Sequence, residues 1–186
     1  MKQLIEKKYV LEFLIYSMFG WIYEVAIEYF QFHHGFVNRG FCFGPYLPIY
    51  GTGALICIIG LKNIYEKKRF IHISKDKSLN ITPIFMFFAI MFICTFVELL
   101  GSYIMEICIG SFMWNYSNYF LNFQGRIALN PSLRFGLGGM FFVYIVHPLF
   151  LKATNSLNKK NTIFLSILII MIMLIDASIQ IFTNLW

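Results

Sequence analysis

Charged residues are scarce in this chain: Asp, Glu, Lys and Arg together make up 13% of its 186 residues, about half the share usual in a soluble domain. Hydrophobic residues make up 59%, which is more than a soluble domain of this length buries in one core. Lipid must cover the surplus, so a water-soluble domain is excluded. The sequence predicts a single integral membrane domain that occupies residues 1–186.

Sequence motifs for metal binding and catalysis are also lacking. The four cysteines, Cys42, Cys57, Cys94 and Cys108, show no Cys-x-x-Cys or Cys/His metal spacing. The pairing of Cys42 with Cys108 on one side of the membrane is left open by the sequence. No phosphate-binding loop, serine-nucleophile elbow or His-Glu-x-x-His motif is present. We therefore expect no catalytic residue, metal site or cofactor in this chain.

Five apolar runs are long enough to cross a bilayer as helices, which takes roughly 20 residues each. The third exceeds one span, so it either tilts or continues beyond the membrane. The second is the weakest, because only Leu47 to Leu61 is cleanly apolar. The sequence predicts an all-α membrane protein, a bundle of about five transmembrane helices at 9–31, 45–65, 81–110, 134–153 and 162–184.

The basic residues predict the orientation of these helices. The net charge is +6, but Lys and Arg lie between the apolar runs rather than in one stripe, which excludes nucleic acid as a partner. Twelve of the 15 lie in the N-terminal segment, 62–80 or 152–161, and only Arg39, Arg126 and Arg134 lie on the other side. Because cytoplasmic segments carry the basic excess, we predict a cytoplasmic N-terminus and an external C-terminus.

Two external connections, 32–44 and 111–133, are apolar and aromatic and contain Gly and Pro. Such backbone is tolerated near a bilayer where protein or a watery cavity satisfies it. We expect both to be packed segments that are either re-entrant or lie in the interface. Their landmarks recur in order, which predicts either a two-fold internal repeat of helix pairs or a chance agreement: Arg39, Pro45, Gly51 and Gly53, then Arg126, Pro131, Gly136 and Gly138.

Six acids lie in or at the ends of the predicted helices: Glu12, Glu24, Glu28, Glu98, Glu106 and Asp176. Three of them, Glu24, Glu98 and Asp176, fall at one level in the external part of the membrane, given the 1.5 Å rise per helical residue. A charged carboxylate there costs about 2.5–3.5 kcal/mol on insertion scales. We therefore expect arginine partners for Glu24 and Glu98, with Arg39 and Arg126 as the candidates.

These charged groups either line a polar pocket for a substrate or ion, or only clamp the loops onto the helices. Asp176 either moves protons or bonds another helix. His147, which precedes Pro148, either satisfies a carbonyl freed by the proline or handles protons. Gly51, Gly53, Gly136, Gly138 and Gly139 predict close helix approach. The candidate pocket residues are Glu24, Glu28, Arg39, Tyr50, Glu98, Glu106, Tyr116, Arg126 and Asp176.

Several strings resemble the CmpB-like, or ABC-transporter type IV, permease family of small bacterial integral membrane proteins. They are FGWIYE at 19–24, NRGFCFGPYLPIYG at 38–51, WNYS at 114–117 and NFQGRIAL at 122–129, with Glu98 and Glu106 between them. The resemblance covers about residues 10–150 and implies a multi-pass protein of the bacterial cytoplasmic membrane. Matched motif residues are Glu24, Arg39, Glu98, Glu106 and Arg126. The chain departs from the family pattern at Asn115, where Asp is usual, and at Phe135, where Trp is common.

The resemblance implies a membrane permease or transport-associated subunit. ATP would act only through a separate partner ATPase, and the small size predicts a homo- or hetero-oligomer in the lipid bilayer. One alternative is a membrane-embedded enzyme acting on lipid or an exported polymer, although no nucleophile and base pair is readable. Another alternative is a non-transporting membrane scaffold or regulator, in which the charged pairs serve structure alone.

Overall fold

A computed structural model describes residues 2–30, 33, 35–67, 70–74, 77–154 and 157–184. It confirms the predicted all-α fold with five helical segments: α1 (Lys2–Phe30), α2 (Pro48–Glu66), α3 (Thr82–Ile109), the continuous run of α4 (Leu129–Phe141), η1 (Phe142–Val146) and α5 (His147–Thr154), and α6 (Lys159–Asn184). In the described part, four of the five are long and apolar enough to cross a membrane, α2 being the exception. The chain is therefore a multi-pass membrane protein. Helix α2, which falls short as a membrane span, covers the apolar run that was predicted to be the weakest.

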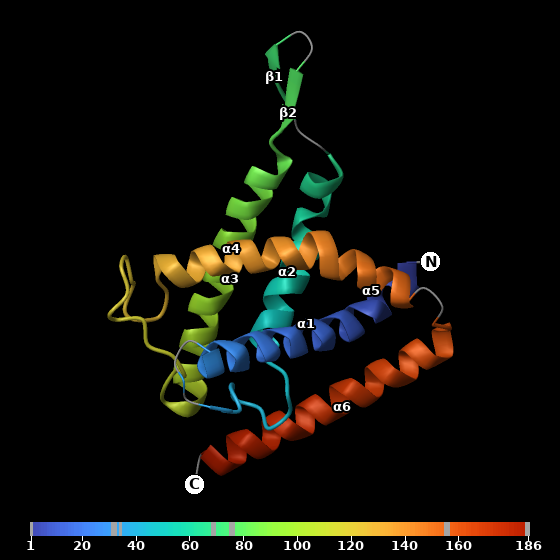
Figure 1. The fold of residues 1–186 in the computed structure, drawn as a ribbon. Helices are drawn as coiled ribbons and strands as arrows, with labels where there is room; N and C mark the ends of the chain where they lie inside the picture. The colour runs from blue at the N-terminus through green and yellow to red at the C-terminus, as the bar shows by residue number, and fades with distance from the viewer. Residues whose placement is uncertain are drawn as a thin grey trace.

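The helices form two crossed groups (Figure 1). Helices α2 and α3 lie side by side and lead into a short β-hairpin, whereas α1, the α4–α5 run and α6 extend across them. The start of α1 and the end of α5 lie at one side of the molecule, and the C-terminal end of α6 lies at the other. The predicted orientation in the membrane stays a prediction, as does the internal repeat.

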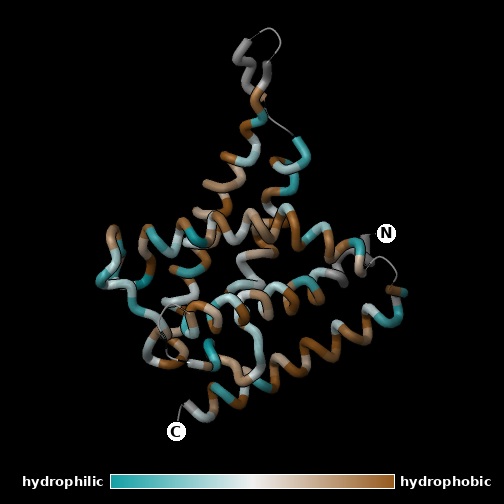
Figure 2. The backbone as a smooth tube through the Cα atoms, viewed as in Figure 1, coloured by the Kyte–Doolittle hydropathy of each residue, from teal (hydrophilic) through white to brown (hydrophobic). Residues whose placement is uncertain are grey.

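Hydrophobic residues line the long helices, and hydrophilic residues gather near their ends and in the connections (Figure 2). A small buried core joins α2, α3 and η1 through Cys57, Leu61, Met86, Ile90 and Val143. Many other large apolar side chains are exposed along the helices, including Phe92 at 72% and Leu174 at 62%. Exposed apolar surface of this extent requires lipid, because water would penalise it.

Three of the five predicted glycines permit close helix contact. A Cβ at Gly51 would lie 2.3 Å from Ser17 Oγ of α1, and one at Gly139 would lie 2.2 Å from Ile90 Cγ2 of α3. Gly136 is similarly tight against Phe87, at 2.6 Å from the ring. In contrast, a Cβ at Gly53 would make only ordinary contact with Cys94, and one at Gly138 would meet no atom within 4 Å. The prediction is therefore wrong at Gly138, which faces open space.

The fourth helix begins at Leu129, five residues before the predicted start at 134. The sequence prediction treated Pro131 as part of a loop, but proline is tolerated in the first turn, where its missing N–H leaves no bond unmade. Farther along, the turn before His147 and Pro148 widens into the π-helical η1. Pro148 cannot donate a hydrogen bond to the preceding turn, and a π-bulge is a common way to accommodate such a break.

A β-hairpin interrupts the segment 62–80, which was predicted to be a basic loop. Strand β1 (Phe70–Ser74) pairs antiparallel with β2 (Lys77–Asn80), with an irregular register between His72 and Ser74. The strands are only five and four residues long, which is too short to give a clear alternating signal. Asn80 then accepts a hydrogen bond from the backbone N–H of Thr82 at 3.0 Å, which helps α3 to begin there.

Candidate functional site

The second loop (110–128) is fastened to α3 through one buried arginine. Arg126, 7% exposed, donates a hydrogen bond from Nη1 to Ser102 Oγ at 3.3 Å and pairs through Nη2 with Glu106 Oε2 at 2.5 Å. Its guanidinium also lies over the rings of Tyr103 and Phe112, at 4.2 and 4.5 Å from their centroids. Helical spacing makes this possible, because Glu98, Ser102 and Glu106 repeat every four residues on one face of α3.

The WNYS string (114–117) gives this loop its shape. Trp114 Nε1 donates to the backbone oxygen of Arg126 at 2.8 Å. Asn115 Oδ1 accepts hydrogen bonds from the backbone N–H and the hydroxyl of Ser117, at 2.9 and 2.6 Å. A side-chain oxygen makes both bonds, and Asp carries that oxygen as well. The departure from the family's usual Asp therefore preserves the turn.

The first loop (35–47) brings a second arginine to a second glutamate. Arg39 Nη1 lies 3.3 Å from Glu28 Oε1 near the end of α1. The neighbouring Asn38 accepts a hydrogen bond from Trp21 Nε1 of α1 at 2.7 Å. At the end of the loop, the backbone N–H of Leu47 donates to the carbonyl of Ser17 at 2.9 Å. Three contacts of different kinds thus tie this loop to α1.

Asp176 of α6 fixes the other side of the first loop. Its carboxylate accepts hydrogen bonds from the backbone N–H groups of Phe43 and Gly44, both at 2.9 Å, and from the Tyr46 hydroxyl. The sequence predicted that Asp176 either moves protons or bonds another helix, and the structure shows it bonded to a loop instead. No sequence signal pointed to the loop as the partner, because the two lie more than 130 residues apart.

The arginine pairing predicted from the sequence is wrong in its partners. Arg39 pairs with Glu28 and Arg126 with Glu106, which are the acids nearer the loop ends of α1 and α3. Glu24 and Glu98, one and two turns deeper, receive tyrosine hydroxyls instead. We call these two acids, together with the tyrosines that bond them, the deep-acid cluster: Glu24 with Tyr50, and Glu98 with Tyr116.

The deep-acid cluster draws on three helices and a loop. Tyr50 of α2 donates to Glu24 Oε1 of α1, and Tyr116 of the second loop donates to Glu98 Oε1 of α3 at 2.9 Å. The Glu24 carboxylate is close enough to Tyr116 to help raise the pKa of its hydroxyl, which places the two acid–tyrosine pairs near each other. Glu98 is 4% exposed, and its Oε2 atom is buried without a hydrogen-bond partner. A buried carboxylate oxygen is normally bonded, so this atom requires an explanation.

Burial and nearby charge shift the ionisation of groups in the two loops. The pKa of the Tyr116 hydroxyl is raised above its ordinary value, first by burial and then by the Glu98 carboxylate. The pKa of the Cys42 thiol is raised to about 11 for the same two reasons, with Asp176 as the carboxylate. All four cysteines are free: Cys42 is buried, whereas Cys108 is exposed.

A separate buried group was not included among the predicted site residues. Glu12 and Tyr16 of α1 are 1% and 0% exposed, and both face His147, the first residue of α5. The Tyr16 hydroxyl lies 2.9 Å from His147 Nδ1, and Glu12 Oε1 lies 3.8 Å from the same atom. The imidazole therefore hydrogen-bonds the Tyr16 side chain of α1, so its role is not limited to satisfying a carbonyl freed by Pro148. The i,i+4 spacing of Glu12 and Tyr16 was the available signal.

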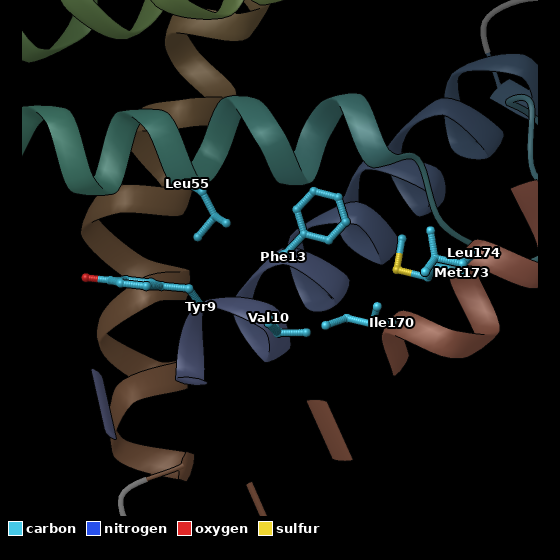
Figure 3. A pocket seen from close by; sticks show the side chains of 7 residues that line it. All are labelled: Tyr9, Val10, Phe13, Leu55, Ile170, Met173 and Leu174. Atoms are coloured by element: carbon cyan, nitrogen blue, oxygen red, sulfur yellow. The ribbon is translucent and has the colours of Figure 1, made fainter. Parts of the chain in front are cut away.

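Two hollows are described, and neither is lined by a predicted pocket residue. The first, of about 330 Å³, lies between α1, α2 and α6 and is lined by Tyr9, Val10, Phe13, Leu55, Ile170, Met173 and Leu174. Figure 3 shows apolar side chains from all three helices around it, with the Tyr9 hydroxyl pointing away from the others. The second, of about 440 Å³, lies near the β-hairpin and includes Tyr65, Thr82 and Tyr144. The predicted polar pocket stays a prediction.

Comparison with known proteins identifies the family. A family model described as "Putative ABC-transporter type IV" matches residues 11–181, which is most of the chain. The chain belongs to this family. The match extends past the motif strings to α6, the helix that carries Asp176. No curated protein and no solved structure matches the chain.

Proposed function

We propose that the chain is the permease, or a transport-associated subunit, of a transporter in the bacterial cytoplasmic membrane. The family match supports a transporter-related membrane protein. The observation that carries the finer proposal is the deep-acid cluster, because carboxylates inside apolar spans are costly and are usually retained for passage of an ion or substrate. ATP would act through a separate ATPase, since no nucleotide-binding motif is present in the sequence.

The paired arginines have a supporting role in this proposal. Arg39 and Arg126 neutralise Glu28 and Glu106 at the loop ends of α1 and α3. They hold the two loops over the deeper Glu24 and Glu98. Substrate would reach these acids when a loop moves, because the two described hollows lie elsewhere.

The direct test is isolation of the native complex in mild detergent through a tag on this chain. We expect an ATPase to co-purify, with a Glu98→Gln variant assembling equally well but losing transport. A variant that assembles and transports like the native chain would refute the role of the cluster. Lipid or polymer turnover by the isolated chain would identify it as an enzyme instead. If the complex assembles but contains no ATPase and turns over neither lipid nor polymer, the chain is a scaffold.

The predicted orientation is tested by labelling of Cys108. This residue is exposed at the loop end of α3, whereas the other three cysteines are buried or half-buried. A thiol reagent that cannot cross membranes should label Cys108 in intact cells from outside. Labelling only after the cells are broken would reverse the proposed orientation.

A further inference from the structure

We propose that the deep-acid cluster binds one small monovalent cation, such as Na⁺. This inference rests on the proposed function, in which the cluster serves transport, and it adds the chemical class of the ligand. Its starting point is Glu98, which is 4% exposed and has a buried Oε2 atom with no hydrogen-bond partner. The other oxygen is held by Tyr116 at 2.9 Å, so the carboxylate has a fixed direction. A buried polar atom of this kind normally has a partner.

The charges around the cluster favour a cation with a single positive charge. The Glu28–Arg39 and Glu106–Arg126 pairs are each neutral overall. No Lys, Arg or His in the described residues forms an ion pair with Glu24 or Glu98. Arg134 of α4 bonds Tyr23, whose ring lies beside that of Tyr50. With a guanidinium this close, a cluster of two carboxylates favours a singly charged cation over a divalent one.

The donor atoms favour a hard cation. The cluster offers carboxylate and phenol oxygens, and oxygen ligands suit alkali and alkaline-earth ions rather than soft transition metals. Within the described ranges, no group of three or more His, Cys, Asp or Glu residues is placed to hold a metal ion. Two carboxylates are few for Ca²⁺, which usually takes more oxygen ligands. The donor set and the charge therefore agree on a monovalent ion.

Close packing limits the size of the ligand. Tyr50 lies against Gly20 of α1 so closely that a Cβ there would be 2.2 Å from the ring. The ring also meets Phe135 of α4, with centroids 6.1 Å apart. Neither described hollow is lined by these residues. Close packing of this kind favours a small ion over a large organic cation, which requires a cavity.

The test uses the purified full-length chain in lipid nanodiscs, with no ATPase or transport substrate. Thermal unfolding is followed while NaCl replaces N-methylglucamine chloride at constant ionic strength. Binding to the folded state raises the midpoint with a saturable dependence on the ion. We expect this rise for the native chain and its loss in Glu98→Gln. In Glu24→Gln, the half-saturating concentration should increase at least tenfold.

The matched control is Glu106→Gln, which makes the same change two turns away on the same helix. This variant should keep a saturable Na⁺ response, at a lower affinity than the native chain because Arg126 loses its neutralising partner. If Glu98→Gln does not fold, Tyr116→Phe removes one hydroxyl from the cluster and should weaken the response instead. An equal midpoint in both salts would overturn the proposal, as would a response lost equally in Glu106→Gln.

A proton is the competing occupant of Glu98. In that case acidification stabilises the native chain, Glu98→Gln removes the pH effect, and Na⁺ has no effect at any pH. That result overturns the cation proposal. It leaves the transporter proposal standing, because co-purification of an ATPase is measured independently. Conversely, Na⁺ binding without any ATPase partner would refute only the transport assignment.

Discussion

Each of the two loops pairs an arginine with a glutamate, but different contacts hold the two loops in place. Each brings an arginine to the glutamate nearest the loop end of a helix, while a tyrosine holds the deeper glutamate. The side chain of Arg39 is 34% exposed, whereas that of Arg126 is 8% exposed and also contacts Ser102 and two rings. The second loop is closed by its own hydrogen bonds, and the first depends on α6. The acids show the opposite order, with Glu28 at 10% and Glu106 at 45% exposed, so the burial and contacts of the arginine itself set how much it stabilises its loop.

Loss of the buried arginine should have the largest effect on stability. Arg126→Ala leaves Ser102 and Glu106 without their donor and removes two cation–π contacts. Glu106 is 45% exposed and can be hydrated, so the cost comes mainly from the lost packing, cation–π contacts and the bond to Ser102. We expect the free energy of unfolding to fall by about 2–4 kcal/mol, as measured by denaturation in nanodiscs. The stability of Arg126→Lys should lie between those of the native chain and Arg126→Ala, since lysine keeps the charge but loses the forked geometry. A loss no greater than that of Arg39→Ala would contradict the comparison.

Removal of the α6 anchor should have the next largest effect, confined to the first loop. Asp176→Asn replaces one acceptor oxygen by a donor facing Tyr46 and two backbone N–H groups. We expect a cost of about 1–3 kcal/mol. Hydrogen exchange should accelerate at the amides of Phe43 and Gly44 but stay unchanged at Tyr116, whose N–H bonds within the second loop. Equal acceleration in both loops would show that they are coupled.

Cys42 provides an independent measure of the same variant. The pKa of its thiol is about 11, raised by burial and by the Asp176 carboxylate. Because the thiolate is the reactive form, alkylation should rise about tenfold per pH unit until pH approaches about 11. Asp176→Asn removes the repelling charge, so the pKa should fall and labelling should accelerate at a fixed pH. A Cys108→Ser background isolates the signal, read as modified peptide by mass spectrometry. An unchanged pH profile would argue against this electrostatic link.

The exposed arginine should contribute less. Arg39→Ala breaks one ion pair of 3.3 Å with a side chain one-third exposed. We expect a loss below about 1 kcal/mol, because solvent screens such pairs. The measurement is the same unfolding experiment, with Arg126→Ala alongside. A cost comparable to that of Arg126→Ala would mean that the first loop relies on Arg39 more than its exposure indicates.

The family departure at position 115 should have the smallest effect. Asn115→Asp keeps the oxygen that accepts from the backbone and hydroxyl of Ser117. We expect a change within about 0.5 kcal/mol. Asn115→Ala, which removes that oxygen, serves as the contrast and should loosen the second loop. If Asn115→Asp loses as much stability as Asn115→Ala, the position requires the neutral amide and not only its oxygen.

The sequence predicted most of the fold, because a span of about 20 apolar residues has few alternatives in lipid. The predicted helices agree with the observed ones to within a few residues, except at Leu129 and at the N-terminal extension of α1. The paired strands β1 and β2 were missed because strands of five and four residues give little periodicity. The glutamates and arginines beneath the loops were identified correctly as residue types, but their pairing was not.

Composition, apolar length and the distribution of Lys and Arg determined by themselves that this protein is a polytopic membrane protein, and they predicted its orientation. Tertiary structure decided the rest. It assigned Arg39 to Glu28 and Arg126 to Glu106, and it brought Asp176 to the first loop. Helical spacing shows which residues share a face, but it cannot show which residue of another segment reaches that face. That choice depends on the path of the loops and the close crossing of helices, which only the packed chain fixes.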